Sequence, residues 1–170
     1  TLHDGITVIG ESAFQDTYFC GELVLPKNLS VMNGSTFSGC RYFSEELKLP
    51  DNLIIIGEWV FVDNSKMRGT VNIPESVQSI GSHAFARCYN LEKVVFPVGL
   101  ESILSNAFMD CHSINSIICK APVPPHVQTG AFDGIPKDNF PLEVPEHAIQ
   151  QYQSAPGWRD FKRIVAHREL

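Results

Sequence analysis

Cysteine and histidine are the residues of this chain whose chemistry would be easiest to put to use. The five cysteines are Cys20, Cys40, Cys88, Cys111 and Cys119. An odd number of cysteines cannot pair completely and no CxxC occurs, so a disulfide framework is not expected. No second pair of ligands lies near any cysteine at metal-site spacing. We therefore predict neither a metal site nor a cofactor.

Cys111 and His112 are neighbours, and a thiol beside an imidazole is the combination that thiol proteases use. Adjacent residues of a strand or loop point apart, however, and no orienting partner recurs in the sequence. The motifs GxSxG, HExxH and GxxxxGK[ST] are also absent from the sequence. We therefore predict no catalytic residues and expect that the chain is not an enzyme.

Charge and hydropathy exclude two classes of partner. The formal net charge is -6, whereas a nucleic-acid-binding domain usually carries a basic stripe. The longest strictly apolar runs, Leu53–Ile56 and Trp59–Val62, are four residues long. A transmembrane helix needs roughly 20 such residues, so no membrane-spanning segment is predicted. Residues 1–5 resemble the middle of a repeat, so we expect a fragment or a processed chain.

The position of any functional side chain depends on an internal repeat. Phenylalanines recur at intervals of 23 or 24 residues: Phe14, Phe37, Phe61, Phe85, Phe108 and Phe132. Prolines recur with the same period: Pro26, Pro50, Pro74 and Pro97. Two residue types that share one period predict coils stacked on a common core. We expect the phenylalanines to form one buried column.

Cys40, Cys88 and Cys111 occupy a single slot of the repeat, beside the phenylalanine column. Free cysteine behaves as a small buried apolar residue, so we predict buried, reduced and metal-free thiols at this slot. The alternative is a disulfide between Cys88 and Cys111, because stacked coils lie within reach of that bond.

Short alternating runs precede each proline, as in Leu23–Leu25, Leu47–Leu49, Val71–Ile73 and Val94–Phe96. Alternation predicts half-buried strands, which stacking would pair in parallel. The pairs Ile9-Gly10, Ile56-Gly57 and Ile80-Gly81 predict tight bends at which glycine adopts unusual dihedral angles.

The repeat loosens after Cys119, where Ala121–Pro125 predicts a stiff extended loop. Residues 146–164 carry apolar side chains at helical spacing and then apolar anchors, which predicts a cap over the open end of the core. We accordingly divide the chain into a solenoid, residues 1–120, and a final irregular coil with a C-terminal cap, residues 121–170.

The units IPESVQSIGSHAFARCYNLEKVVFP and VGLESILSNAFMDCHSINSII resemble the leucine-rich repeats of the Bacteroides surface-protein-A (BspA) type. The AF-x-x-C-x-x-L core and the strand-proline step carry the likeness over residues 1 to 120, and LEVPEHAIQQYQSAPGWRDF is similar to the end of many such proteins. Asn64 and Thr17 depart from the pattern where cysteine is usual, and Lys120 departs where proline is usual. The resemblance implies export to the bacterial surface, the periplasm or the medium, and adhesion to host or matrix proteins.

The predicted fold is thus a leucine-rich-repeat solenoid of the α/β horseshoe-like class. It has coils of 23 or 24 residues, short parallel strands and little helix outside the cap. Its functional face should consist of side chains that point outward from the strand runs. We predict that a protein partner binds Lys48, Asn72, Lys93, Val95 and Ile118. The alternative function is a structural spacer array that positions another domain.

Overall fold

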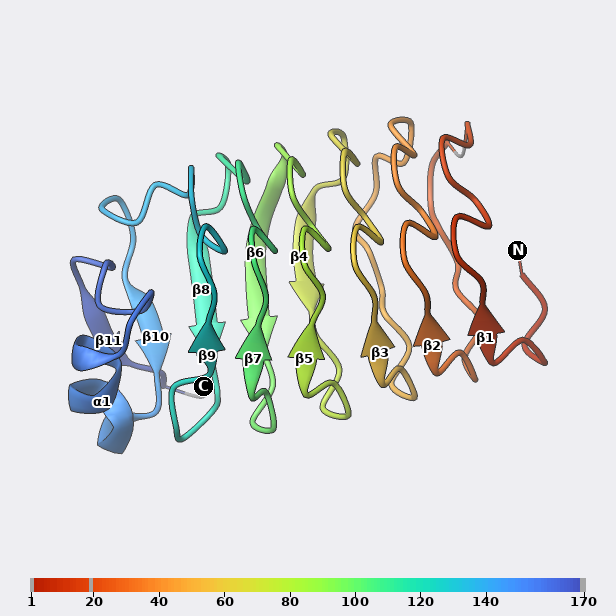
Figure 1. Cartoon of the computed structure of the whole chain (residues 1–170). Coiled ribbons are helices and arrows are strands. Elements are labelled where there is room, and N and C mark those ends of the chain that lie inside the picture. Colours follow the sequence, from red (N-terminus) through yellow and green to blue (C-terminus); the bar gives the residue numbers. More distant parts are fainter. Residues whose placement is uncertain (1, 19, 169–170) are drawn as a thin grey trace.

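The computed structural model describes residues 2–18 and 20–168. Residues 1, 19, 169 and 170, which belong to the predicted ranges 1–120 and 121–170, lie outside this description. The chain winds into coils that stack side by side, and two parallel sheets form opposite walls of the stack (Figure 1). The prediction of a repeat solenoid is therefore confirmed.

One wall is a six-stranded parallel sheet in the order β1-β2-β3-β5-β7-β9. Its strands are β1 (Val8–Ile9), β2 (Val31–Met32), β3 (Ile55–Ile56), β5 (Ser79–Ile80), β7 (Ser102–Ile103) and β9 (His126–Val127). The register pairs Ile9 with Met32, and Ile56 with Ile80. The isoleucines of the Ile-Gly pairs therefore lie in strands, and the repeat contains a second sheet that the sequence analysis did not predict.

The other wall is a five-stranded sheet in the order β11-β10-β8-β6-β4. Its strands are β4 (Gly69–Asn72), β6 (Leu91–Phe96), β8 (Ser116–Cys119), β10 (Leu142–Val144) and β11 (Ile164–Ala166). The predicted strands at residues 23–25 and 47–49 do not form, although the alternation of buried and exposed side chains is kept. Next to the second run, the Glu46 carboxylate accepts a hydrogen bond of 3.2 Å from the backbone N–H of Thr70. This N–H therefore binds a side chain and not the backbone of a neighbouring strand.

The bend after the six-stranded sheet differs from the predicted glycine bend. Positive φ angles fall three residues after the strand end, and in the first five coils they fall on residues other than glycine: Ser12, Ser35, Trp59, His83 and Asn106. Glycine occupies this position only in the sixth coil, at Gly130. Gly57 has ordinary dihedral angles, but a Cβ placed on it would lie 2.9 Å from the Met32 carbonyl oxygen of the preceding coil. Glycine is required there because the coils approach closely and not because φ is unusual.

Backbone hydrogen bonds continue from coil to coil through this bend. The amide of Phe37 donates to the Val60 carbonyl at 2.9 Å, and that of Phe61 donates to the Ala84 carbonyl at 2.7 Å. A left-handed conformation costs an ordinary residue about 1–2 kcal/mol. The inter-coil bonds offset this cost and leave few unpaired polar groups in the bend.

The phenylalanines form the predicted column, and this expectation is confirmed. Consecutive rings from Phe14 to Phe108 stack with centroid distances of 5.2 to 5.6 Å, and Phe132 follows Phe108 at 6.3 Å. Phe37, Phe61 and Phe85 are fully buried, whereas Phe14 in the first coil is only partly buried. Each buried ring stabilises the stack by about 1.5–3 kcal/mol relative to an exposed one.

The side chains at the cysteine slot of the repeat donate hydrogen bonds to the backbone. The thiols of Cys40, Cys88 and Cys111 each donate to the carbonyl oxygen of the phenylalanine in the preceding coil, at 3.1 to 3.3 Å. Asn64 fills the same slot, and its amide nitrogen donates to the Phe37 carbonyl at 2.8 Å. Thr17, in the first coil, donates to the Phe14 carbonyl of its own coil at 2.7 Å. The slot therefore selects a small donor, which explains both departures from cysteine.

The segment predicted to cap the core covers the end of the phenylalanine column. It contains a 3-10 turn, η1 (Glu146–Ala148), and α1 (Ile149–Ser154), which is the only α-helix among the described residues. Trp158 is fully buried 5.1 Å from the Phe132 ring, and its indole N–H donates to the Pro125 carbonyl at 2.8 Å. Strand β11 then pairs with β10 and extends the sheet.

Replacement of Asn64 should separate the stability that its amide nitrogen contributes as a hydrogen-bond donor from the stability that its unpaired oxygen costs. Asn64 Oδ1 is buried with no hydrogen-bond partner, and such an atom typically costs about 1–3 kcal/mol. We expect Asn64→Cys to raise the free energy of unfolding by about 1 kcal/mol, because the donor stays and the unpaired oxygen is removed. Asn64→Ala should lower it, since it also loses the donor. Urea denaturation measures both changes, and a less stable Asn64→Cys variant would contradict this account of the slot.

Removal of the cap should expose the end of the core. We expect deletion of residues 146–170 to cause aggregation, because the Phe132 ring and the edge of β10 lose their cover. Trp158→Ala is a milder test and should cost about 3–5 kcal/mol. Arg159→Ala, at an exposed neighbouring position, is the control. Size-exclusion chromatography and thermal melting follow both, and a monomeric deletion variant with an unchanged Tm would refute the capping role.

Candidate interaction surfaces

The structure brings only part of the predicted binding face together. Asn72, Val95 and Ile118 are direct neighbours in the register of β4, β6 and β8. Lys93 lies in the adjacent row, between Thr70 and Ser116. These four residues therefore share the outer surface of the five-stranded sheet, as the alternation predicted.

Two members of the predicted face differ from expectation. Ile118 points outward but is only 7% exposed, and it lies between Val95 and Glu143 in the register. Lys48 belongs to a coil without a strand in this sheet, and its ammonium group forms an ion pair with Glu22 at 3.3 Å. The apolar centre expected at Val95 and Ile118 is consequently smaller than predicted, because little of Ile118 remains accessible.

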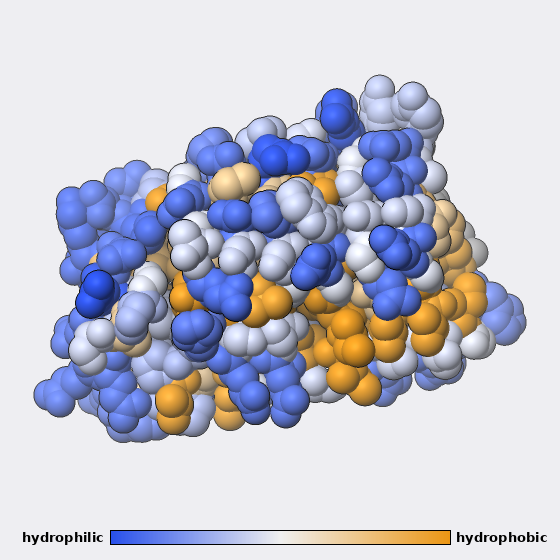
Figure 2. Space-filling model, in the orientation of Figure 1, coloured by the Kyte–Doolittle hydropathy of each residue, from blue (hydrophilic) through white to orange (hydrophobic). Residues whose placement is uncertain are grey.

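A larger apolar surface lies on the six-stranded sheet. Val8, Val31 and Ile55 are register partners on the outer side of β1, β2 and β3, and Ile54 adjoins Ile55. Val8 is 52% exposed, Ile54 54% and Ile55 48%. We call these four residues the apolar strip, and Figure 2 shows a hydrophobic band over β1 to β3. Contiguous exposed apolar side chains often mark interaction sites.

Sequence reasoning missed the apolar strip because it assigned the Ile-Gly pairs to bends. The sequence feature that could have revealed it is the type of residue that precedes the buried residue of each two-residue strand. It is apolar in the first three coils, at Val8, Val31 and Ile55, and serine in the next two, at Ser79 and Ser102. Had these positions been recognised as strands, alternation would have placed all of them on the surface.

A shallow pocket opens at one end of the apolar strip. Its volume is about 370 Å³, and its lining includes Ile54, Ile55, Glu58, Gly81 and Leu104. Gly57 and Gly81 also line it and present backbone without a side chain, and glycine is required at position 81 because a Cβ there would collide with the Gly57 carbonyl. A partner side chain could therefore approach the backbone of the sheet between Ile55 and Leu104.

The bend beside this sheet carries a polar ladder. The Trp59 ring stacks on His83 with a centroid distance of 3.7 Å, and the Asn106 amide donates to His83 Nε2 at 3.1 Å. Burial, aided by the nearby Arg87 charge, lowers the pKa of His83. The neutral imidazole suits its role as acceptor. Arg87 also binds Asp63 through two bonds of 2.6 and 2.7 Å, and this hydrogen bonding holds the pKa of Asp63 below its usual value.

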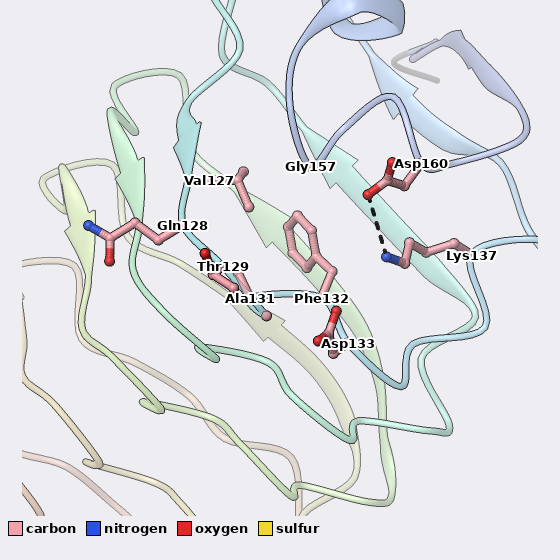
Figure 3. Close-up of a pocket in the computed structure, with 10 residues that line it drawn as sticks. Val127, Gln128, Thr129, Ala131, Phe132, Asp133, Lys137, Gly157 and Asp160 are labelled. Carbon is pink, nitrogen blue, oxygen red and sulfur yellow. Dashed lines mark ion pairs between the residues drawn. The ribbon is translucent and has the colours of Figure 1, made fainter.

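A second pocket separates the last bend from the cap (Figure 3). Its volume is about 220 Å³, and its lining includes Val127, Phe132, Lys137, Gly157 and Asp160. Lys137 and Asp160 face each other at 4.0 Å, and a Cβ on Gly157 would lie 2.7 Å from Val127. This pocket belongs to the seam between the cap and the last coil, where the ion pair and the close glycine contact hold the two together.

The cysteine and histidine chemistry considered from the sequence does not assemble into a site. Cys111 is buried while His112 is exposed and bonded to the Gly134 carbonyl. The described parts of the chain contain no group of three or more histidine, cysteine or acidic side chains placed to bind a metal ion. Over the same residues, no helix has the length and apolar character needed to cross a membrane.

Comparison with known proteins identifies the repeat. The model of the BspA type leucine rich repeat region matches residues 1–137 in six copies. A leucine-rich repeat protein from Bacteroides ovatus ATCC 8483 has a similar structure, with 17% identity and a TM-score of 0.51 over 97% of this chain and 56% of that one. A leucine rich cell surface protein from Faecalibacterium prausnitzii A2-165 gives 18% identity and a TM-score of 0.42 over 98% and 52%. The chain thus spans about half the length of these two proteins, and no protein of curated function matches it.

The thiols at the repeat slot should be unreactive in the native protein. Burial raises the pKa of Cys40, raises that of Cys88 well above its usual value, and brings that of Cys111 to about 12. Because the thiolate is the reactive form, a thiol reagent at neutral pH should modify exposed Cys20 and spare these three. All five cysteines should react after unfolding. Rapid native labelling of Cys40, Cys88 or Cys111 would disprove their burial.

Proposed function

Because the chain belongs to the BspA-type leucine-rich repeat family, we propose that it is a non-catalytic module that binds a protein partner. We further propose that it is exported and acts at the bacterial surface, in the periplasm or in the medium, as the family resemblance implies. Adhesion to a host or matrix protein is the form of binding that we favour. The spacer array remains the alternative.

The exposed apolar strip is the observation that carries this proposal. Val8, Ile54 and Ile55 each leave about half of their surface in water, although the register positions equivalent to Val8 and Ile55 are serines in β5 and β7. A purely structural array has no need for apolar side chains at these positions. Short hydrogen-bonded strands and a packed core hold the strip rigid, so little conformational entropy is lost when a partner binds.

The face with Lys48, Asn72, Lys93, Val95 and Ile118 remains a second proposed contact region. Its support is the half-buried polar row of Thr70, Lys93 and Ser116 beside half-buried Val95. Substitution of Ile118 would disturb packing, since this side chain is 7% exposed. Val95→Glu is therefore the variant that tests this face.

The proposal is tested with purified extracellular-matrix, serum and host cell-surface proteins, each titrated over the immobilised full-length chain by surface plasmon resonance. We expect saturable binding of at least one of them. The double variant Val31→Ser/Ile55→Ser, which copies Ser79 and Ser102, should keep the fold and weaken that binding by about tenfold, or 1.4 kcal/mol. Val123→Ser, at a 68% exposed valine outside the strip, is the matched control.

Each outcome of this titration decides one point. Loss of affinity in Val95→Glu with an unaffected strip variant would move the contact to the five-stranded sheet. Absence of saturable binding to every protein tested would favour the spacer array.

A further inference from the structure

We propose that the apolar strip binds a cationic amphipathic segment of a partner protein, one in which lysine or arginine side chains flank an apolar row. This inference rests on the proposed binding function and adds the chemistry of the partner. Three observations carry it: the continuity of the strip, the pocket at its end, and the charge of its surroundings.

The strip has the form of a narrow apolar track that crosses the strands. Val8, Val31 and Ile55 follow one another in register, and neighbouring strands of a sheet lie about 4.8 Å apart. Ile54 widens the track at β3, next to the pocket between Ile55 and Leu104. A segment with apolar side chains along one side can lie on this track, with a terminal side chain in the pocket.

Acidic side chains border the track. Glu58 lines the pocket, and Glu11 occupies the equivalent position of the first coil, three residues after the outward strand residue. Both side chains are exposed, and neither forms an ion pair with a described residue. Glu101, before β7, is exposed and equally free of an ion pair.

Lysine and arginine side chains without an acidic partner are missing from this side of the solenoid. Arg87 is the only lysine or arginine in the segments that carry the six-stranded sheet and the bends that follow it: residues 5–16, 28–40, 52–63, 76–87, 99–110 and 123–134. Its guanidinium group is paired with Asp63 at 2.6 Å. Lys27, which precedes the second of these segments, is ion-paired with Asp4 at 3.5 Å. The border of the track therefore carries carboxylates without ion-pair partners, while the nearby basic side chains are already paired.

Charge complementarity distinguishes between the possible occupants. In a face-to-face pair of copies, Glu11 and Glu58 would lie among carboxylates without a free basic partner, and like charges at an interface are unfavourable. An anionic lipid surface would be repelled in the same way. A cationic segment satisfies both carboxylates while its apolar row covers the strip. Such rim charges should act mainly on the association rate and make binding depend on salt.

The test uses the full chain and three labelled synthetic peptides of equal length, followed by fluorescence anisotropy. One peptide alternates isoleucine with lysine, the second alternates isoleucine with glutamate, and the third alternates serine with lysine. The protein variants are Ile54→Ser/Ile55→Ser, Glu11→Lys/Glu58→Lys and the control Val123→Ser. Because Ser79 and Ser82 stand at positions equivalent to 55 and 58, polar residues at these positions are compatible with the fold.

We expect the isoleucine–lysine peptide to bind at least about tenfold more tightly than either other peptide, with an affinity that falls as salt is raised. The Ile54→Ser/Ile55→Ser variant should lose this binding about tenfold, the charge-reversal variant should prefer the glutamate peptide, and the control should be unchanged. Equal binding of the lysine and glutamate peptides, no binding of either, or binding that survives the serine substitutions would overturn the inference.

Two further measurements separate the competing occupants. Analytical ultracentrifugation should find no self-association that depends on Ile54 and Ile55, and flotation with phosphatidylserine vesicles should find no bound chain. A strip-dependent dimer or strip-dependent vesicle binding would overturn the inference. If one of the matrix, serum or cell-surface proteins binds through the apolar strip while the peptides show no preference for charge, the proposed function stands. The inference that the partner segment is cationic is then wrong.

Discussion

Coils of about 23 residues cannot bury their own apolar side chains, so every coil of this protein depends on the one stacked against it. The spacing of about 4.8 Å between paired strands then applies to the whole cross-section of the coil. It brings the phenylalanine rings to centroid distances of 5.2 to 6.3 Å. It also leaves no room for a Cβ at Gly57 or Gly81. The repeat in the sequence is the consequence of this single distance.

The same constraint explains how the slot beside the column tolerates different residues. Cysteine, asparagine and threonine differ in polarity, yet Cys88, Asn64 and Thr17 all donate to a phenylalanine carbonyl. In the stacked coils, this carbonyl lies inside the core, where an unsatisfied acceptor is costly. The slot therefore requires a small donor and not a particular chemical class. The thiols in it are structural, and their buried surroundings suppress the reactivity that a thiol would have in water.

Outward positions escape the stacking constraint, and this freedom makes a repeat scaffold useful for binding. The hydroxyl of Ser102 donates a hydrogen bond of 2.8 Å to that of Ser79 on the surface. Val8, Val31 and Ile55 occupy equivalent positions with apolar side chains. Both choices are compatible with the ladder beneath them. A surface can thus change its partner by substitution at these positions while the core stays the same. The cap prevents unwanted association, since Trp158 and β11 cover an end of the core that would otherwise attract other chains.

The sequence alone determined the period, the buried column, the cysteine slot and the capped end, because the stacking of coils imposes the same residue type at the same place in every repeat. It did not reveal the second sheet, since strands of two residues such as Ile55–Ile56 are too short for a period of two to be visible. The positive φ angles at Trp59 and His83 were equally hidden, because inter-coil hydrogen bonds and not local propensity stabilise them. Only the tertiary structure decided which outward residues are accessible. Exposure depends on neighbouring coils, which cover Ile118 and leave Ile54 and Ile55 in water.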